Sequence, residues 1–289
     1  MEPDPHNPHQ ELRASWDANA AAWTDSVRSN AIASRAMGTD EAALHALAYS
    51  GADRILDVGC GEGWLVRAVK ASGMSVASAD LHGFDGSAEL VAAAQAAGGG
   101  HFFHLTYEDA SADPLRLGGP YDAAIANFSL LGAALEPLLR ALWCVVRPGG
   151  QLFVQTLHPF NVEPPCESGW RTETFAGMGE GYAAPMPWYF HTFGGWVALL
   201  TFGGWRLTSV EEPLHSETGR PLSLLLTAER DAFIRNPMGH NEHERLAQIA
   251  EQIHGPDVHP AAYPRAERQR LVDHLKQGWA RRRPLRPGG

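Results

Sequence analysis

Three closely spaced glycines mark the most informative chemistry in the chain. An apolar segment at residues 55–58 runs into Gly59, Gly61 and Gly63, and a helical pattern begins directly afterwards. Glycines at such a turn let the backbone approach a ligand where a Cβ would collide, and the N-terminus of the following helix favours a negative group such as a carboxylate. The pattern predicts a ligand-binding turn, although a tight strand-to-helix connection would use the same residues.

The spacing of these glycines argues against two common nucleotide motifs. A dinucleotide-binding fingerprint needs a glycine where this chain has Trp64, which is too bulky for a pyrophosphate to lie against the turn. A P-loop would end in Lys followed by Ser or Thr, and this loop lacks that pair. The turn is therefore expected to bind a different kind of ligand.

Strand and helix patterns alternate around this turn. Such alternation predicts a parallel sheet with helices on both faces, and parallel sheets bind ligands outside the carboxyl ends of their strands. The predicted strands are RILDVG, MSVASADL, HFFHLTY, YDAAIAN, QLFVQTL, WRLTSVEE and LSLLLTAE.

Composition and charge narrow the class of protein further. The chain has 289 residues, 44% of them hydrophobic, and a formal net charge of −10 at pH 7. An acidic body repels phosphate backbones, which disfavours nucleic acid as a partner. The three cysteines lack disulfide or zinc spacing, and no apolar run reaches the roughly 20 residues that span a bilayer. We expect a cytoplasmic protein without a signal peptide, a metal site or a membrane partner.

The motifs in combination resemble those of a class I S-adenosylmethionine-dependent methyltransferase of the small-molecule type. The resemblance implies a Rossmann-like three-layer α/β sandwich with a seven-stranded, mostly parallel sheet in the order 3-2-1-4-5-7-6. It also implies S-adenosylmethionine as cofactor and S-adenosylhomocysteine as product. It covers about residues 10–230 and rests on DVGCGEGW, the acid that closes the second strand, YEDA, YDAAIANFSLL and VRPGGQLFVQTLHP.

The chain divides into three predicted parts. Residues 1–50 are expected to form a helical lid, and residues 51–230 the methyltransferase domain. Within that domain, prolines, glycines and aromatic residues break the strand rhythm at 160–200, which is typical of a functional lid insertion. Residues 231–289 are predicted to form a helical tail, which is a candidate dimer interface.

The resemblance places the cofactor around the glycine turn. The turn is expected to lie beneath the methionine part, and Glu108 or Asp109 to accept from the adenine amine, with Asp109 favoured. Asn127 and Phe128 end a strand and should face the cofactor, although a buried Phe is as often core. The other matching positions are Asp57, Gly59, Cys60, Gly61, Glu62 and, from the N-terminal lid, Trp23.

Two acids compete for the ribose hydroxyls, which the family binds with the acid that closes the second strand. Asp80 follows Asp57 at about the spacing that a strand-helix-strand unit requires. Asp85 instead precedes a helix that Ser87 would cap, which is the local pattern usual in the family. The spacing favours Asp80.

Methyl transfer from a sulfonium is an in-line displacement, so the protein mainly aligns the nucleophile and excludes water. Where a base is needed, His158 is the candidate, because it follows a strand at the carboxyl edge of the sheet. His158 could equally hydrogen-bond the chain near Pro159. Aromatic side chains predict a pocket wall for the acceptor or an anchor for a long loop. The candidates for that wall are Trp16, Trp170, Met186, Trp188 and Tyr189.

The predicted function is methyl transfer to an oxygen, nitrogen or sulfur nucleophile of a small, partly apolar or aromatic metabolite. One alternative is an RNA or tRNA methyltransferase, which would need a basic surface around the cleft. Another is a regulatory module that binds the cofactor without catalysis.

Overall fold

The computed structural model describes residues 7–230, Ile249 and residues 252–253. Ile249 and Ile253 pack against the main hydrophobic core. The remainder of the predicted helical tail lies outside the described residues, so its secondary structure and its role as a dimer interface stay predictions. None of the helices in the described part of the chain combines the length and apolar character that a bilayer-spanning helix needs.

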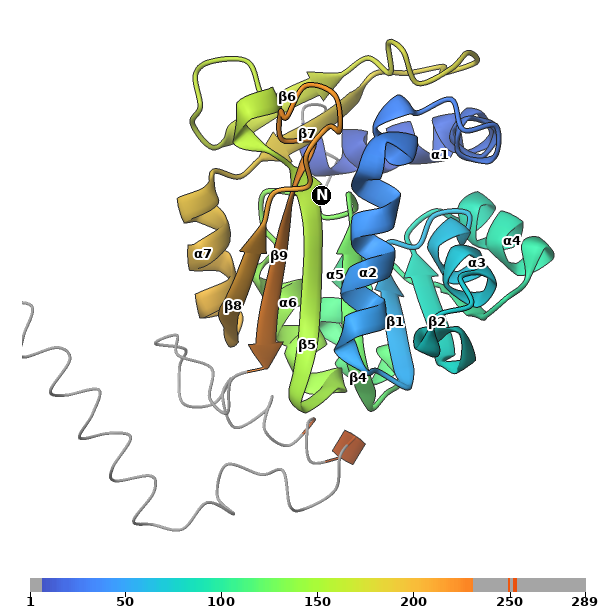
Figure 1. The fold of residues 1–289 in the computed structure, drawn as a ribbon, viewed down its shortest axis with the longest axis vertical. Helices are drawn as coiled ribbons and strands as arrows, with labels where there is room; N and C mark the ends of the chain where they lie inside the picture. Colours follow the sequence, from blue (N-terminus) through green and yellow to red (C-terminus); the bar gives the residue numbers. More distant parts are fainter. Residues whose placement is uncertain (1–6, 231–248, 250–251, 254–289) are drawn as a thin grey trace, which may run out of the picture.

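A seven-stranded sheet forms the centre of the fold (Figure 1), with the order β3-β2-β1-β4-β5-β9-β8. The first five strands are parallel, and β9 runs antiparallel to both β5 and β8. The predicted order is confirmed, because it differs only in the numbering that an added hairpin causes. The strands are β1 (Arg54–Val58), β2 (Asp80–Asp85), β3 (His101–His104), β4 (Tyr121–Asn127), β5 (Val146–Leu157), β8 (Trp205–Glu211) and β9 (Ser223–Arg230).

Helices cover both faces of this sheet, because parallel strands are buried on both sides. Alternate residues of a strand point to opposite faces, so Ile55 joins one core cluster, while Leu56 and Val58 join the other. The first cluster is covered by α2 (Asp40–Ser50), α3 (Trp64–Ala71) and α4 (Ala88–Ala97). The second is covered by α5 (Tyr107–Ala112), α6 (Glu136–Val145) and α7 (Phe193–Phe202).

The long N-terminal helix α1 (Pro8–Arg28) lies across the carboxyl ends of the strands (Figure 1). Asn7 caps it by accepting from the His9 N–H, and Pro8 occupies its first turn, where no backbone donor is needed. Short helical turns connect the other elements. They are the π-helical η1 (Arg35–Thr39) and the 3₁₀ turns η2 (Ser75–Ser78), η3 (Pro114–Leu117) and η4 (Pro159–Asn161).

The insertion at 160–200 is more regular than its composition indicates. It contains a hairpin of β6 (Gly169–Glu173) and β7 (Met186–Phe190), followed by α7. The hairpin sits above α1 in Figure 1. Asn19 of α1 is fully buried beneath it, donates to the Ala184 carbonyl at 2.7 Å and accepts from the Ala183 N–H at 2.7 Å. One side chain therefore satisfies the backbone of a loop that would otherwise lack partners.

Candidate active site

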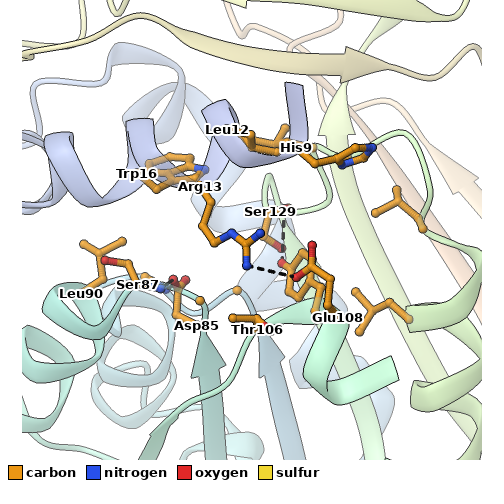
Figure 2. A pocket seen from close by; sticks show the side chains of 18 of the residues that line it. His9, Leu12, Arg13, Trp16, Asp85, Ser87, Leu90, Thr106, Glu108 and Ser129 are labelled. Carbon is orange, nitrogen blue, oxygen red and sulfur yellow. Dashed lines mark hydrogen bonds and ion pairs between the residues drawn. The ribbon is translucent and has the colours of Figure 1, made fainter. Parts of the chain in front are cut away.

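A cavity of about 660 Å³ lies at the carboxyl ends of the parallel strands, beneath α1 (Figure 2). Its floor comes from the turn after β1, the end of β2, the start of α5 and the loop after β4. Figure 2 shows the roof helix above and the acidic floor residues below. The roof residues from α1 are His9, Gln10, Leu12, Arg13, Trp16, Asp17 and Trp23.

The glycine turn has a positive φ at each of its three glycines, at 70° for Gly59, 54° for Gly61 and 80° for Gly63. A Cβ on Gly59 would stand 2.4 Å from the Tyr107 hydroxyl, so this glycine lets the turn pack against α5. At Gly61 the nearest atom to such a Cβ would be Trp23 Nε1, at 3.6 Å. The turn therefore opens to the cavity at Gly61. Cys60 also lines the cavity, and burial raises the pKa of its thiol.

Asp85 closes β2 and lines the cavity. Its Oδ2 accepts from the Gly61 N–H and its Oδ1 from the Ser87 N–H, both at 2.9 Å. Burial raises the pKa of Asp85, and these two backbone donors oppose that rise. The carboxyl group is thus fixed in orientation, with acceptor capacity left for a ligand.

The preference for Asp80 over Asp85 is wrong. Asp80 opens β2 instead of closing it, because residues 75–78 form the turn η2 and the strand begins later than its apolar pattern indicates. At this far end of the strand, Asp80 pairs with Arg54 at 3.1 Å and with His82 at 2.9 Å. The hydrogen bond from His82 lowers the pKa of Asp80. Asp80 therefore belongs to a surface ion-pair cluster remote from the cavity.

Asp57 lies on β1 behind the glycine turn and is 4% exposed. It does not line the cavity directly. No donor among the described residues hydrogen-bonds its carboxyl group. Burial, with a smaller contribution from Asp85, raises the pKa of Asp57 to about 8.

Glu62 does not face the cavity, in contrast to its predicted role as a cofactor contact. Its side chain is fully buried and accepts from Arg28 Nε at 2.9 Å. Arg67 Nη2 donates to both of its oxygens, at 2.7 and 2.6 Å. Because two guanidinium groups already hold its charge, Glu62 ties the end of α1 to α3 instead of binding a ligand.

The start of α5 separates the two acids of the YEDA segment. Thr106 caps the helix by accepting from the Asp109 N–H at 3.1 Å. Glu108 lines the cavity and lies 3.8 Å from Arg13 of the roof (Figure 2). Asp109 instead pairs with Arg116 at 3.3 Å. The preference for Asp109 is wrong, because consecutive helical residues point about 100° apart.

Asn127 and Phe128 both line the cavity at the end of β4. The buried Oδ1 atom of Asn127 has no hydrogen-bond partner among the described residues. Phe128 has a φ of 52°, an uncommon conformation for a residue with a side chain, and its N–H donates to the Gln155 carbonyl at 2.8 Å. The strand end is therefore shaped toward the cavity, as its position predicts.

His158 does not reach the cavity. Its Nδ1 accepts from the Phe160 N–H at 3.0 Å, which caps η4. Its Nε2 lies 2.7 Å from the Glu212 carboxylate, beyond the end of β8. The assignment of His158 as a base facing the acceptor is wrong, because the turn after Leu157 directs the ring toward the antiparallel edge of the sheet.

The predicted aromatic wall divides into two groups. Trp16 and Trp23 line the cavity, with their rings edge to face at 5.1 Å. The residues of the hairpin do not line it, because α1 lies between the hairpin and the cavity. Trp170 packs against His9, Met186 is buried with Leu131 and Phe175, Trp188 packs on that cluster, and the Tyr189 N–H donates to the Leu131 carbonyl.

The sequence reasoning missed several cavity residues, above all on the roof. The missed roof positions 9, 12, 13 and 17 share one helical face with Trp16 and Trp23, at spacings of three, four and seven. This helical period was the available signal. The other missed residues are Asn7, Gln10, Trp64, Gly86, Ser87, Leu90, Thr106, Tyr107, Ser111, Ser129, Leu131, Gly132, Ala134, Leu135, Pro137 and Leu138.

Comparison with known proteins places this cavity in a family context. Residues 55–150 match the family model of a methyltransferase domain. A Burkholderia thailandensis 1,6-didemethyltoxoflavin-N1-methyltransferase, solved with 1,6-didemethyltoxoflavin and S-adenosylhomocysteine, is 17% identical, with a TM-score of 0.54 over 80% of this chain and 93% of that one. None of the curated proteins compared with the chain matches it.

Two further solved structures share the fold. Magnesium protoporphyrin IX methyltransferase from Synechocystis PCC 6803, with bound S-adenosylhomocysteine, is 17% identical, with a TM-score of 0.53 over 78% of this chain and 100% of that one. A Haloferax volcanii methyltransferase in complex with the Trm112 methyltransferase activator is 15% identical, with a TM-score of 0.55 over 74% of this chain and 98% of that one.

The sheet order and the domain match together define the class of protein. The chain is an enzyme whose sheet has the Rossmann-like order of the solved methyltransferases, and its residues 55–150 match the model of a methyltransferase domain. The predicted family is confirmed at the level of this domain, and S-adenosylhomocysteine is bound in the solved structures from Burkholderia thailandensis and Synechocystis.

Proposed function

We propose that this chain transfers the methyl group of S-adenosylmethionine to an oxygen, nitrogen or sulfur atom of a small, partly apolar molecule. The observation that carries the proposal is a single cavity in which the fixed Asp85 carboxylate, the open glycine turn and the aromatic roof share one space. Cavities of this size suit small ligands that are largely enclosed.

Two acceptors that line the cavity and one behind the glycine turn support the fit of such a donor. Asp85 has acceptor capacity left for hydroxyl groups, and the Asn127 Oδ1 atom lacks a partner among the described residues. Asp57 carries a buried carboxyl group without a donor beside the turn, where an ammonium group would hold it ionised. A ligand that brings hydroxyl and ammonium donors satisfies groups that otherwise remain unsatisfied in the interior.

S-adenosylmethionine supplies a methyl group already activated by a sulfonium sulfur. The residues of this chain bind the donor and the acceptor, align them for methyl transfer, and exclude water from the site. Trp16 and Trp23 close the roof with their rings packed edge to face. With His158 directed away from the cavity, an acceptor that is a neutral amine or a readily ionised hydroxyl or thiol suits the site best.

The apolar part of the cavity supports a small acceptor. Leu12 of the roof faces a floor to which the loop after β4 and the start of α6 contribute. An apolar lining of this kind favours a partly apolar molecule over a nucleic acid strand, whose backbone the net charge of −10 would also repel. The residues in that compartment are Leu131, Ala134, Leu135, Pro137 and Leu138.

We further propose a cytoplasmic setting. Cys60 is buried and Cys166 is exposed, and neither forms a disulfide. Free thiols persist in a reducing compartment. Cell fractionation with detection of the native chain tests the proposal, and recovery in an exported fraction would overturn it.

Calorimetric titration with S-adenosylhomocysteine, S-adenosylmethionine and NAD tests the cofactor. Binding of the first two should raise the melting temperature with ligand concentration. If neither S-adenosylhomocysteine nor S-adenosylmethionine binds at millimolar concentration while NAD does bind, the proposal is overturned.

The acceptor requires a second experiment. A metabolite extract is incubated with methyl-labelled donor and the enzyme, and mass spectrometry identifies the labelled product. Asp85→Ala is the inactive control and Asp80→Ala the matched active one. A parallel incubation contains total RNA. If the label appears in RNA and in no small molecule, the acceptor is a nucleic acid and the proposed acceptor class is wrong.

A further inference from the structure

Ser87 stands at the start of α4 but does not cap it. Its backbone is extended, with φ −94° and ψ 116°, as an N-cap residue requires, yet its side chain accepts no hydrogen bond from the helix. Serine at this position ordinarily accepts from an N–H two or three residues further on. Thr192 does so at α7, where it accepts from the Gly195 N–H at 3.1 Å. The hydroxyl of Ser87 therefore does not cap the helix, although it stands at the N-cap position.

The same hydroxyl has no partner in the described part of the chain. Ser87 is 2% exposed, and its buried Oγ atom makes no hydrogen bond there. A buried polar group without a partner is unfavourable for folding, and such groups are few in native proteins. Its backbone N–H, in contrast, is used, because it donates to Asp85 Oδ1 at 2.9 Å. The structure thus leaves one donor unused next to a fixed carboxylate.

Ser87 also lines the cavity, and Figure 2 shows its side chain beside that of Asp85 beneath the roof helix. The Asp85 carboxylate, the Ser87 hydroxyl and the first backbone N–H groups of α4 lie together here. The helix has ten residues, and its N-terminus carries no side-chain cap. An uncapped helix start with a buried, unpartnered hydroxyl points to a ligand that supplies the missing acceptor.

We infer that Ser87 completes the binding site for a ligand hydroxyl group, and that this group belongs to the ribose of S-adenosylmethionine. The inference rests on the proposed function. An ionised carboxylate only accepts, so a ligand group bound to Asp85 must donate. A hydroxyl that donates to Asp85 still has lone pairs, and the Ser87 O–H donates to them. An ammonium group has no lone pair for Ser87, and an anion would be repelled by Asp85.

The experiment compares Ser87→Ala with Thr192→Ala by calorimetric titration of S-adenosylhomocysteine and by thermal unfolding without ligand. Ser87→Ala should weaken S-adenosylhomocysteine binding roughly threefold to tenfold, as loss of one neutral hydrogen bond does, and should not lower the melting temperature of the unliganded protein. Thr192→Ala should lower the melting temperature and leave affinity unchanged, because its hydroxyl caps a helix remote from the cavity. Glycine is also tolerated at the N-cap position, so Ser87→Gly should show the same loss of affinity.

The 2′-deoxy and 3′-deoxy analogues of S-adenosylhomocysteine add a readout that a structural role would not move. One of them should bind the wild type more weakly than the parent compound, and the penalty for that missing hydroxyl should shrink in Ser87→Ala. If Ser87→Ala lowers the melting temperature as Thr192→Ala does and leaves S-adenosylhomocysteine affinity unchanged, Ser87 is an ordinary cap and the inference is overturned. Failure of the wild type to bind S-adenosylhomocysteine would instead overturn the proposed function.

Discussion

Acidic side chains stand at both ends of the central sheet, and their partners differ. At the amino end, Asp80 pairs with Arg54 and His82, and Asp122 pairs with Arg147 at 2.6 Å. At the carboxyl end, Asp57 has no donor among the described residues, and burial raises its pKa and that of Asp85.

Within one sheet, the acids at the amino end therefore contribute to stability, and those at the carboxyl end are available for binding. The satisfied acids join neighbouring strands and need no ligand. Asp57, which has no donor among the described residues, destabilises the unliganded fold and can recover that free energy only from a bound partner. The number of charged side chains at the amino end of the sheet is therefore a weaker indication of function than a buried acid without a partner at the carboxyl end.

The largest expected effect is on stability and concerns Asp57. Its pKa rises on folding from the usual 3.8 to about 8, so between these values the folded state holds a proton that the unfolded state has released. The unfolding free energy should therefore fall as pH rises from about 4 to 8, by on the order of 5 kcal/mol in total. Asp57→Asn should remove this fall, as measured by urea unfolding at several pH values.

Asp80→Asn is the control for the Asp57 variant. The pKa of Asp80 is lowered in the folded state, so its contribution has the opposite sign: it is present at neutral pH and lost as pH falls through the folded pKa. Equal pH slopes in wild type and Asp57→Asn would show that Asp57 is not a buried, unpaired acid.

The next effect is on ligand affinity and contrasts the two ends of β2. Asp85→Ala should weaken S-adenosylhomocysteine binding by roughly 1.5–3 kcal/mol, a tenfold loss or more, because it removes charge-assisted hydrogen bonds. Asp80→Ala should leave affinity unchanged. Isothermal titration of both variants measures this, and an equal, negligible loss in the two would remove the ribose role from the strand.

The third prediction extends the comparison from the floor to the roof. Trp16 lines the cavity, whereas Trp188 packs above α1. Trp16→Ala should weaken S-adenosylhomocysteine or acceptor binding several-fold, because it removes a buried ring from the site. Trp188→Ala should reduce the melting temperature and leave ligand affinity unchanged. A larger loss of affinity in Trp188→Ala would place the hairpin in the acceptor site after all.

A fourth prediction concerns motion. Asn19 joins α1 to the hairpin, so we expect the two to open and close as one lid over the cavity. Hydrogen exchange should slow in both segments together when S-adenosylhomocysteine binds. Strand β8, at the antiparallel edge, is the internal reference. Slowing in α1 alone would show that the hairpin is a fixed layer.

The smallest expected effect is that of His158→Gln. Since the ring pairs with Glu212 outside the cavity, the pH dependence of methyl transfer should be unchanged once the acceptor is identified. Loss of the acidic limb of the kcat/KM profile, where protonation of a base lowers the rate, would restore His158 as the base.

The alternation of strands and helices, the glycine turn and the family were all predictable from the amino-acid sequence alone. These follow from local patterns: apolar period, glycine at positive φ, and strand ends that must lie at one edge of a parallel sheet. Asn127 and Phe128 belong to this group, because their position at the end of β4 is enough to place them at the cavity.

Tertiary structure decided which acids face the cavity. Asp80 and Asp85 differ by where β2 begins, which the turn η2 shifts by a few residues. Glu62 is taken up by Arg28, 34 residues earlier, and His158 by Glu212, 54 residues later. Asn19 holds a loop 164 residues away and thereby places the aromatic hairpin above the roof. Such pairings depend on which charges and backbone groups meet after the chain has closed distant loops, and no local pattern records them.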